Sequence, residues 1–481
     1  MKDIYRKNIG SLLLLMLAVF PVLYLHHQYF DLVEAKSIAL RYSLLFCSIA
    51  ISIYVLLSDT KKEKRNKLNA LEISLLLFSL SSLLTTVLSH CFRESFFGTE
   101  GWGIGSFAFL MLSCIVIFTS HQKISHVWIC RGISIFNIFI FLLVIFDSMG
   151  MDLFGLHGNM LNEQRFDYVS TIGNINWLVG YLSLLLPVLI SCYIKEKDPL
   201  YKSLHFICTS LGLFSLVLCN SDSAFAGIGL VLMVAIPLLI RKNTYYREFS
   251  LLLIVLSLEL LLISSLPAFH EKLLSYDGFF ALAVNNRFLF FILCSLGMTG
   301  FIFDPQIKQM NKAWKIGFVL FAELCLAGLA GFFLKDLISS IQTYNYYWGN
   351  NRLNLWHTTL FAFKNYLIPE KQWFGIGLEQ QADWYGYLNC ELNTVFKTTH
   401  SEPLQILFTM GYQGMLFYLL VIASFVWTFI KQVKTNGNLC YSLSLIMYFG
   451  QSLFNSCNPV NFAVFVIVVS LLNNELHAHS E

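Results

Sequence analysis

One histidine and three arginines stand where the chain changes from apolar to polar. His400 lies just before the apolar run 404–430, and the three arginines, Arg352, Arg287 and Arg165, lie in or beside polar segments. A histidine titrates near neutral pH and can take a proton from a hydroxyl. The planar guanidinium of arginine binds oxyanions through two parallel hydrogen bonds. These residue types suit proton transfer beside a bound anion.

Two acidic residues accompany them. Glu402 follows His400 by two positions, where it can orient that histidine or cap the helix that begins there. Asp222 lies in a short polar turn, where it can pair with an arginine or cap a helix that starts at Ser223. The sequence leaves both pairs of alternatives open.

Metal and nucleotide chemistry have no sequence support. The 12 cysteines are scattered, without a CxxC pair or a metal-ligand spacing, and no GxxxxGKS phosphate loop occurs. We therefore expect no metal site, no cofactor and no chemistry driven by a cytosolic nucleotide.

The elements that must position these residues are membrane spans. Of 481 residues, 56% are hydrophobic and only 13% are charged, and the mean hydropathy is +0.64. A soluble domain is about 25% charged, so soluble and disordered classes are excluded. The recurring apolar runs predict an all-α polytopic membrane protein. Because two pairs of these runs are tight hairpins, we expect 12–14 transmembrane helices. The candidate spans are 9–25, 38–57, 70–90, 104–119, 127–146, 175–194, 203–219, 223–240, 249–267, 287–303, 315–334, 404–430, 439–456 and 459–473.

Lys and Arg predict the orientation. With alternating spans, 21 of the 32 fall on the side of the N-terminus, and six fall in short loops on the other side. The positive-inside rule therefore predicts a cytosolic N-terminus. The net charge of +3 follows from this anchoring and does not indicate nucleic-acid binding. The larger polar segments, 91–103, 147–174, 268–287 and 335–403, all fall on the predicted outer side.

The longest of these segments carries a predicted helix. The helix is expected to begin after Asn350-Asn351 and to end at Pro369, with Arg352 in its first turn. Apolar residues recur at helical spacing along one face: Leu353, Trp356, Leu360, Phe363 and Leu367. This pattern predicts an amphipathic helix on the outer membrane face. The many Trp and Tyr side chains of the segment can form an interfacial belt or stack on sugar rings.

Three ordered motifs resemble a known family. His400-Ser401 is followed, after nine residues, by Gly411-Tyr412-Gln413-Gly414. Upstream, Arg352 precedes Trp356 and the stretch Trp373-Phe374-Gly375-Ile376-Gly377. Earlier still, Arg165 precedes Gly173-Asn174-Ile175-Asn176. Over about residues 160–475, the chain resembles the superfamily of O-antigen ligases and Wzy-type O-antigen polymerases.

One motif departs from the family. Its members usually carry Ser-Arg-Ser/Gly-Ala at the start of a mid-chain span, whereas this chain has Ser221-Asp222-Ser223-Ala224. Asp222 thus replaces one of the family's two diphosphate-binding arginines, and Arg287 or Arg165 could substitute for it. The departure indicates a divergent branch.

The resemblance implies a GT-C-like membrane fold with four parts. These are N-terminal helices in 1–160, core helices in 161–334, an extracytoplasmic loop in 335–403 and C-terminal helices in 404–481. The implied activity is metal-independent, inverting glycosyl transfer for surface polysaccharide assembly. It would take a glycan from an undecaprenyl-diphosphate donor to a hydroxyl of a glycan or lipid acceptor, at the outer face of the bacterial cytoplasmic membrane.

In this reading His400 is the base, and Arg352, with Arg287 or Arg165, binds the diphosphate. The motifs do not separate a ligase from a polymerase, because the two differ only in acceptor. The alternative function is a transporter or flippase for a lipid-linked saccharide. A transporter is expected to show internal repeats and charges at mid-span. No convincing repeat is evident, and Glu259 and Glu323 are the exceptions to nearly charge-free spans.

Overall fold

The structure is a computed structural model of the whole chain that falls into two compact units. It describes all residues except 1, 26–27, 58–66, 100–102, 159, 243–244, 270, 273–283, 285–286, 344–347, 388–397 and 479–481. The first unit comprises Met1–Ile129, Tyr346–Leu445 and Ser452–Glu481, and the second comprises Cys130–Asn345 and Ile446–Gln451. The division of the chain into four parts stays a prediction. The first unit combines residues of three of those parts: the N-terminal helices, the long loop and the C-terminal region.

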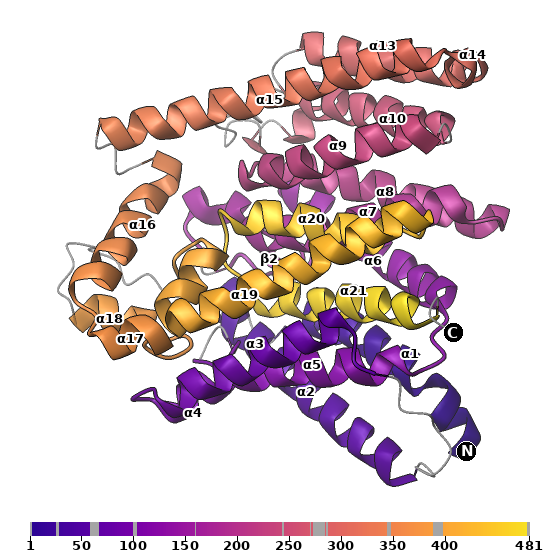
Figure 1. Cartoon of the computed structure of the whole chain (residues 1–481). Helices are drawn as coiled ribbons and strands as arrows, with labels where there is room; N and C mark the ends of the chain where they lie inside the picture. The colour runs from indigo at the N-terminus through magenta and orange to yellow at the C-terminus, as the bar shows by residue number, and fades with distance from the viewer. Residues whose placement is uncertain are drawn as a thin grey trace. The chain divides into compact units, whose positions relative to one another are not determined.

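The first unit is a helical bundle with a group of short helices at one end (Figure 1). Helix α3 packs against α5 and α19, and α21 packs against α1, α2 and α5. Helices α16 and α17 pack against α19. The elements of this unit are α1 (Lys2–Leu23), η1 (Tyr29–Asp31), α2 (Leu32–Leu57), α3 (Ala70–Val87), α4 (Phe92–Phe97), α5 (Ser106–Ser120), α16 (Trp348–Asn365), α17 (Pro369–Phe374), α18 (Gln381–Tyr387), α19 (Glu402–Thr435) and α21 (Pro459–Ala478).

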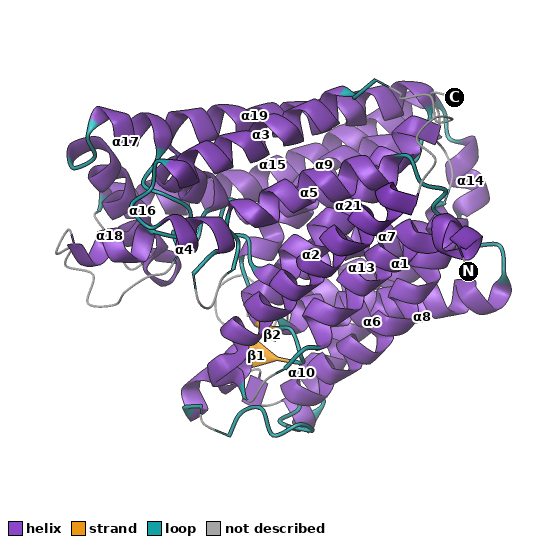
Figure 2. Ribbon diagram, turned by 90° about the horizontal axis from the view of Figure 1, so that it is seen from below, coloured by secondary structure: helices purple, strands orange, loops and turns teal. Residues whose placement is uncertain are grey.

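The second unit is also helical, with one small β-ribbon. Strands β1 (Tyr168–Val169) and β2 (Gly173–Asn174) pair antiparallel, with Tyr168 opposite Asn174 (Figure 2). Helix α7 packs against α8, α10 against α13, and α9 against α15. The remaining elements are α6 (His126–Ser148), η2 (Asn162–Asp167), α7 (Ile175–Lys195), α8 (Pro199–Leu218), α9 (Ser223–Lys242), α10 (Tyr246–Ser265), η3 (Pro267–Phe269), α13 (Arg287–Ile302), α14 (Asp304–Gln309), α15 (Lys312–Gln342) and α20 (Cys440–Ser452), of which α6 and α20 each share residues with the first unit.

The predicted helical membrane architecture is confirmed at a coarse level. Each of the 14 apolar runs coincides with a helix of the structure. Among the described residues, nine helices are long and apolar enough to cross a membrane: α2, α3, α6, α7, α8, α9, α10, α19 and α21. Helices α1, α5 and α13 have shorter apolar stretches, and α20 has 13 residues. A total of 12–14 crossings remains a prediction.

Polar side chains tie several helix ends of the first unit together. The Glu72 carboxylate, near the start of α3, accepts hydrogen bonds from Ser120 at the end of α5 (3.0 Å) and Asn473 near the end of α21 (2.9 Å). His126 at the start of α6 bonds to Tyr441 at the start of α20 (2.8 Å). These contacts join helix ends that the alternation of spans predicts on the cytosolic side, and that orientation stays a prediction.

Candidate functional site

His400 sits in a tight turn directly before α19. Its φ of +49° lies in the left-handed region, which few residues other than glycine adopt. The Thr399 hydroxyl donates to the Ser401 carbonyl (2.7 Å) and accepts from the Ser401 N–H (3.3 Å). The Thr399 N–H donates to Gln405 Oε1, one turn into α19 (2.9 Å). Side chains on both sides of His400 therefore hold its unusual backbone conformation.

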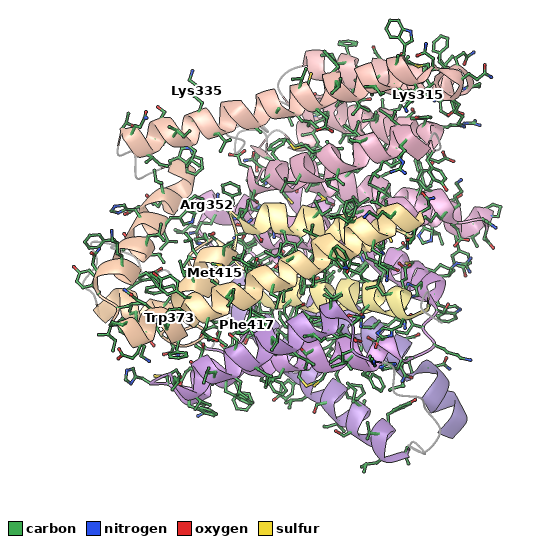
Figure 3. All side chains as sticks on the ribbon, in the orientation of Figure 1. Lys315, Lys335, Arg352, Trp373, Met415 and Phe417 are labelled. Atoms are coloured by element: carbon green, nitrogen blue, oxygen red, sulfur yellow. The ribbon has the colours of Figure 1, made fainter. Side chains whose placement is uncertain are left out.

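Helix α16 presents Arg352 and Trp356 to this turn. The two residues are four positions apart, so they lie on the same face of the helix. The Trp356 indole donates to the Thr399 carbonyl (3.1 Å), which fixes the helix against the His400 turn. The Trp348 ring meets the Trp356 ring edge-on, with centroids 6.2 Å apart. Figure 3 shows Arg352 on α16.

The segment between α20 and α21 provides a third wall. The Asn455 carbonyl accepts from the Glu402 N–H (3.1 Å), and Asn455 Oδ1 accepts a long hydrogen bond from Arg352 Nη2 (3.5 Å). The Phe454 ring lies 5.8 Å from the Trp356 ring. Three separate segments thus converge on His400, Arg352 and Trp356.

The electrostatics of this site set the protonation state of His400. Burial lowers the pKa of His400, and the positive charge of Arg352 lowers it further, from 6.5 to about 4. The imidazole is therefore neutral near pH 7 and keeps one nitrogen lone pair. A neutral imidazole beside a guanidinium can accept a proton next to a bound anion.

Glu402 begins α19, as expected of a helix-capping or helix-start residue. Its Oε1 accepts from the Tyr418 hydroxyl (3.3 Å), and its N–H donates to the Asn455 carbonyl. A role in orienting His400 stays a prediction.

The two glycine motifs pack against each other. Gly411 has a left-handed φ of +68° and breaks α19 into a short helix and a long one. A Cβ at Gly411 would lie 2.5 Å from the Trp373 carbonyl oxygen, and a Cβ at Gly375 would clash with the Thr409 carbonyl. The Gly377 N–H donates to that same Thr409 carbonyl (3.1 Å). Close backbone contact explains why both motifs contain glycine.

Glu379 joins the second of these motifs to the polar segment 91–103. Its carboxylate accepts from the Ile104 N–H (2.7 Å), from the Thr99 hydroxyl (3.0 Å) and from the Thr99 N–H. Burial raises the pKa of Glu379, and these hydrogen bonds act in the opposite direction. Glu379 thus anchors a predicted outer loop to the segment after α17.

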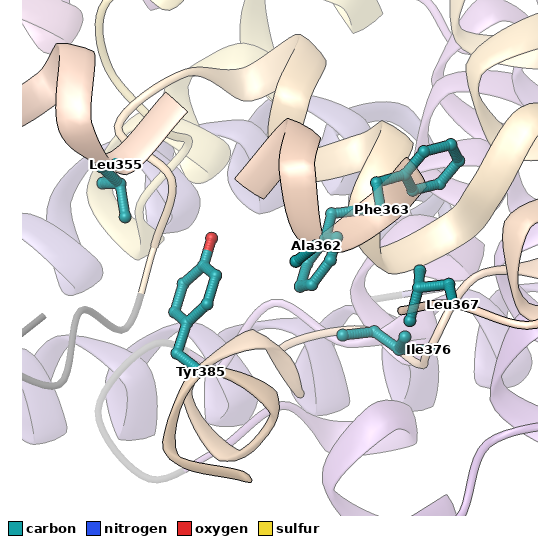
Figure 4. Packing of buried hydrophobic residues seen from close by; sticks show 7 residues of the cluster. Leu355, Ala362, Phe363, Leu367, Ile376 and Tyr385 are labelled. Carbon is teal, nitrogen blue, oxygen red and sulfur yellow. The ribbon is translucent and has the colours of Figure 1, made fainter. Parts of the chain in front are cut away.

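Part of the apolar face of α16 packs against protein, and the location of this helix at the outer membrane face stays a prediction. Leu355, Ala362, Phe363 and Leu367 form a buried cluster with Tyr385 of α18, Phe408 of α19 and Ile376 (Figure 4). Leu360, which was assigned to the same face, is 47% exposed. The periodicity was correct, but the short helices that cover the face have no comparable signal in the sequence.

The other predicted arginines belong to the second unit. Arg165 Nη2 donates to the Gly150 carbonyl (2.5 Å), a contact that braces the loop after α6. Arg287 begins α13, as predicted for the start of a span, and its side chain lies outside the described residues. Diphosphate binding by either arginine stays a prediction.

The GNIN segment and the SDSA segment meet in the second unit. Asn174 accepts from the Asn176 N–H (2.8 Å) and so caps α7. The Ser221 hydroxyl donates to Asn176 Oδ1 (2.7 Å). Asp222 lies between them and α9, with an exposed side chain. These contacts tie the start of α7 to the turn before α9.

One group of side chains in the second unit could hold a metal ion. Asp147, Asp152 and His157 each offer a ligand atom, and these atoms lie within 4.8 Å of one another. Backbone N–H groups already donate to both carboxylates: Ser170 to Asp147, and Leu156 and His157 to Asp152. The group therefore also closes the loop after α6 without a metal. The spacing of these three residues forms no recognisable metal-binding motif in the sequence.

Sequence reasoning missed four residues of the site: Thr399, Gln405, Glu379 and Asn455. Thr399 and Gln405 flank the His400-Ser401 motif, so extending that motif by a few positions would have found them. Asn455 lies in Asn455-Ser456-Cys457-Asn458, a polar break between two apolar runs on the predicted outer side. That signal was available. No sequence signal connects Glu379 to residues 99–104.

The chain matches no protein-family model and no curated protein. The resemblance to O-antigen ligases and polymerases accordingly rests on the sequence motifs alone.

Proposed function

We propose that the protein is a membrane glycosyltransferase of the O-antigen ligase or polymerase type, acting at the outer face of the bacterial cytoplasmic membrane. The observation that carries the proposal is the neutral His400 held beside Arg352 by α16, the start of α19 and Asn455. Its donor is an undecaprenyl-diphosphate-linked glycan, and its acceptor is a hydroxyl of a glycan or lipid.

The reaction is an inverting displacement. The acceptor oxygen forms a bond to the anomeric carbon, and its proton passes to the neutral His400 imidazole. The bond from the anomeric carbon to the diphosphate oxygen breaks, and the electron pair stays on the diphosphate. Arg352 stabilises the charge that develops there, through the paired N–H donors of its guanidinium. The residues of the site perform these steps without a metal ion.

The test replaces His400 with Ala and measures transfer from lipid-linked donor in membranes. Loss of the base is expected to reduce the rate by about 10²–10⁴-fold. His357→Ala is the matched control, because His357 lies on the exposed side of α16 and should leave transfer unchanged. If His400→Ala transferred glycan at the wild-type rate, the proposed mechanism would be wrong.

A flippase for a lipid-linked saccharide is the second candidate, and one observation favours it. Glu259 lies within the membrane-span candidate α10 and is 6% exposed, and its Oε2 has no hydrogen-bond partner among the described residues. Intramembrane acids of this kind often serve transport. Flipping of a labelled lipid-linked sugar by the purified protein in vesicles, lost in Glu259→Gln, would support this candidate.

A further inference from the structure

We propose that Asn455 is a positioning residue that holds the Arg352 guanidinium at the site through an uncharged side-chain acceptor. This inference deepens the proposed function and rests on it for the identity of the anion, a lipid-linked diphosphate. It concerns a segment that none of the family motifs includes.

The position of Asn455 suits this role. Its side chain, only 5% exposed, reaches Arg352 of α16, and its backbone carbonyl receives the N–H of Glu402, two residues after His400. One residue therefore contacts both the helix that carries the cation and the turn that carries the base. The neighbouring Phe454 packs near Trp356, one helical turn from Arg352. Asn455 thus fixes the spacing between Arg352 and His400.

The carboxamide suits this role better than a carboxylate would. A buried amide oxygen requires a donor, and Arg352 provides one of its five N–H groups. An aspartate at this position would bind the guanidinium as a charge-assisted pair and compete with a diphosphate. The carboxamide adds no charge of its own to the site.

Other charged or titratable groups face this region. Glu402 and Tyr418 come from α19, and Cys457 comes from the same segment as Asn455. A new carboxylate at position 455 would add to these groups and would lie nearer to the guanidinium than to solvent. It is therefore expected to oppose the effect of Arg352 on His400.

The test uses full-length protein in lipid nanodiscs and two variants, Asn455→Asp and Asn455→Ala. The first readout is the pH dependence of His400 modification by diethyl pyrocarbonate, followed on its own peptide by mass spectrometry. The second is binding of undecaprenyl diphosphate. The matched control is Asn365→Asp, which adds the same charge at the far end of α16, 13 residues or about 20 Å from Arg352.

We expect Asn455→Asp to move the midpoint of His400 modification upward from about pH 4 toward its ordinary pKa of 6.5. Both Asn455 variants should weaken undecaprenyl diphosphate binding about tenfold, as loss of one hydrogen bond to a charged group would. Asn365→Asp should change neither readout.

The outcomes separate the two proposals. If Asn455→Asp is folded but has the wild-type midpoint, the positioning role is wrong, even if the wild-type protein transfers glycan. If the midpoint moves as expected but the wild-type protein binds no undecaprenyl diphosphate, the positioning role stands and the proposed function is wrong.

Discussion

His400 combines the right protonation state with a low basicity. With a pKa of about 4 it is neutral at physiological pH, but a base is most effective when its pKa lies near the working pH. Arg352 contributes to the low value through its positive charge. A diphosphate bound at Arg352 would offset that charge and make His400 a stronger base. Donor binding and proton transfer are thereby coupled at one pair of residues.

This coupling predicts two different pH dependences. The profile of kcat/KM reports the free enzyme, and that of kcat reports the complex with donor. His400 must be neutral to act, so activity falls as the pH drops below its pKa. We expect the acid limb of kcat/KM near pH 4 and the acid limb of kcat at a higher pH.

The measurement is glycan transfer at varied donor concentration across this pH range. In Arg352→Gln the acid limb of kcat/KM should move to a pH above that of the wild-type protein, because the cation that lowers the pKa of His400 in the free enzyme is gone. Coincident limbs in the wild-type protein would show that the bound donor does not act on His400.

At the scale of the elements, the backbone break at Gly411 joins the site to a membrane span. It divides α19 into residues 402–410, which follow the His400 turn, and residues 412–435, which are long enough to cross a bilayer. The backbone of Trp373 in α17 and of Gly375, which follows α17, packs against Gly411 at this break. The site is therefore built on a helix that is fixed at both ends.

Gly411→Ala and Gly375→Ala are expected to disrupt this junction. Each glycine has a positive φ, and an added Cβ would meet a backbone carbonyl of the partner segment. We expect destabilisation of about 2 kcal/mol or more, seen as a fall in the thermal midpoint. Gly437→Ala is the control, since its Cβ would lie 3.5 Å from Gln432, an ordinary contact. An unchanged midpoint in both test variants would mean that α17 does not brace α19.

Sequence patterns predicted the helices better than the residues against which each helix packs. Hydrophobic periodicity identified α16 and most of its apolar face, because periodicity depends only on helix geometry. It did not reveal that Phe363 belongs to one buried cluster with Phe408 and Tyr385, since that packing depends on residues distant in sequence. The H-S and G-x-x-G spacing located His400 and the break at Gly411. Asn455 was not predicted, because a single polar residue between two spans does not indicate its contacts.

At the scale of the molecule, the first unit has two polar ends. At one end, Asn438 of the loop after α19 bonds to Glu475 near the end of α21 (2.6 Å). At the other, Asn455 contacts Arg352 and the start of α19. Helix α19 therefore runs from the Asn455 end to the Asn438 end, α20 runs back, and α21 runs in the same direction as α19. The Lys and Arg counts predict that the first end faces the cytosol.

Reporter fusions test this assignment. Alkaline phosphatase is active only outside the cytosol, so we expect it to be inactive when fused after Asn436 and active when fused after Cys457. Green fluorescent protein at the C-terminus should fluoresce, because an even number of crossings returns the chain to the cytosol. The opposite pattern would place His400 and Arg352 on the cytosolic side. The orientation predicted from Lys and Arg and the proposed use of an outer-leaflet donor would then both be wrong. The location of Asn455 makes the Cys457 fusion decisive, since the site and this loop share one end of the first unit.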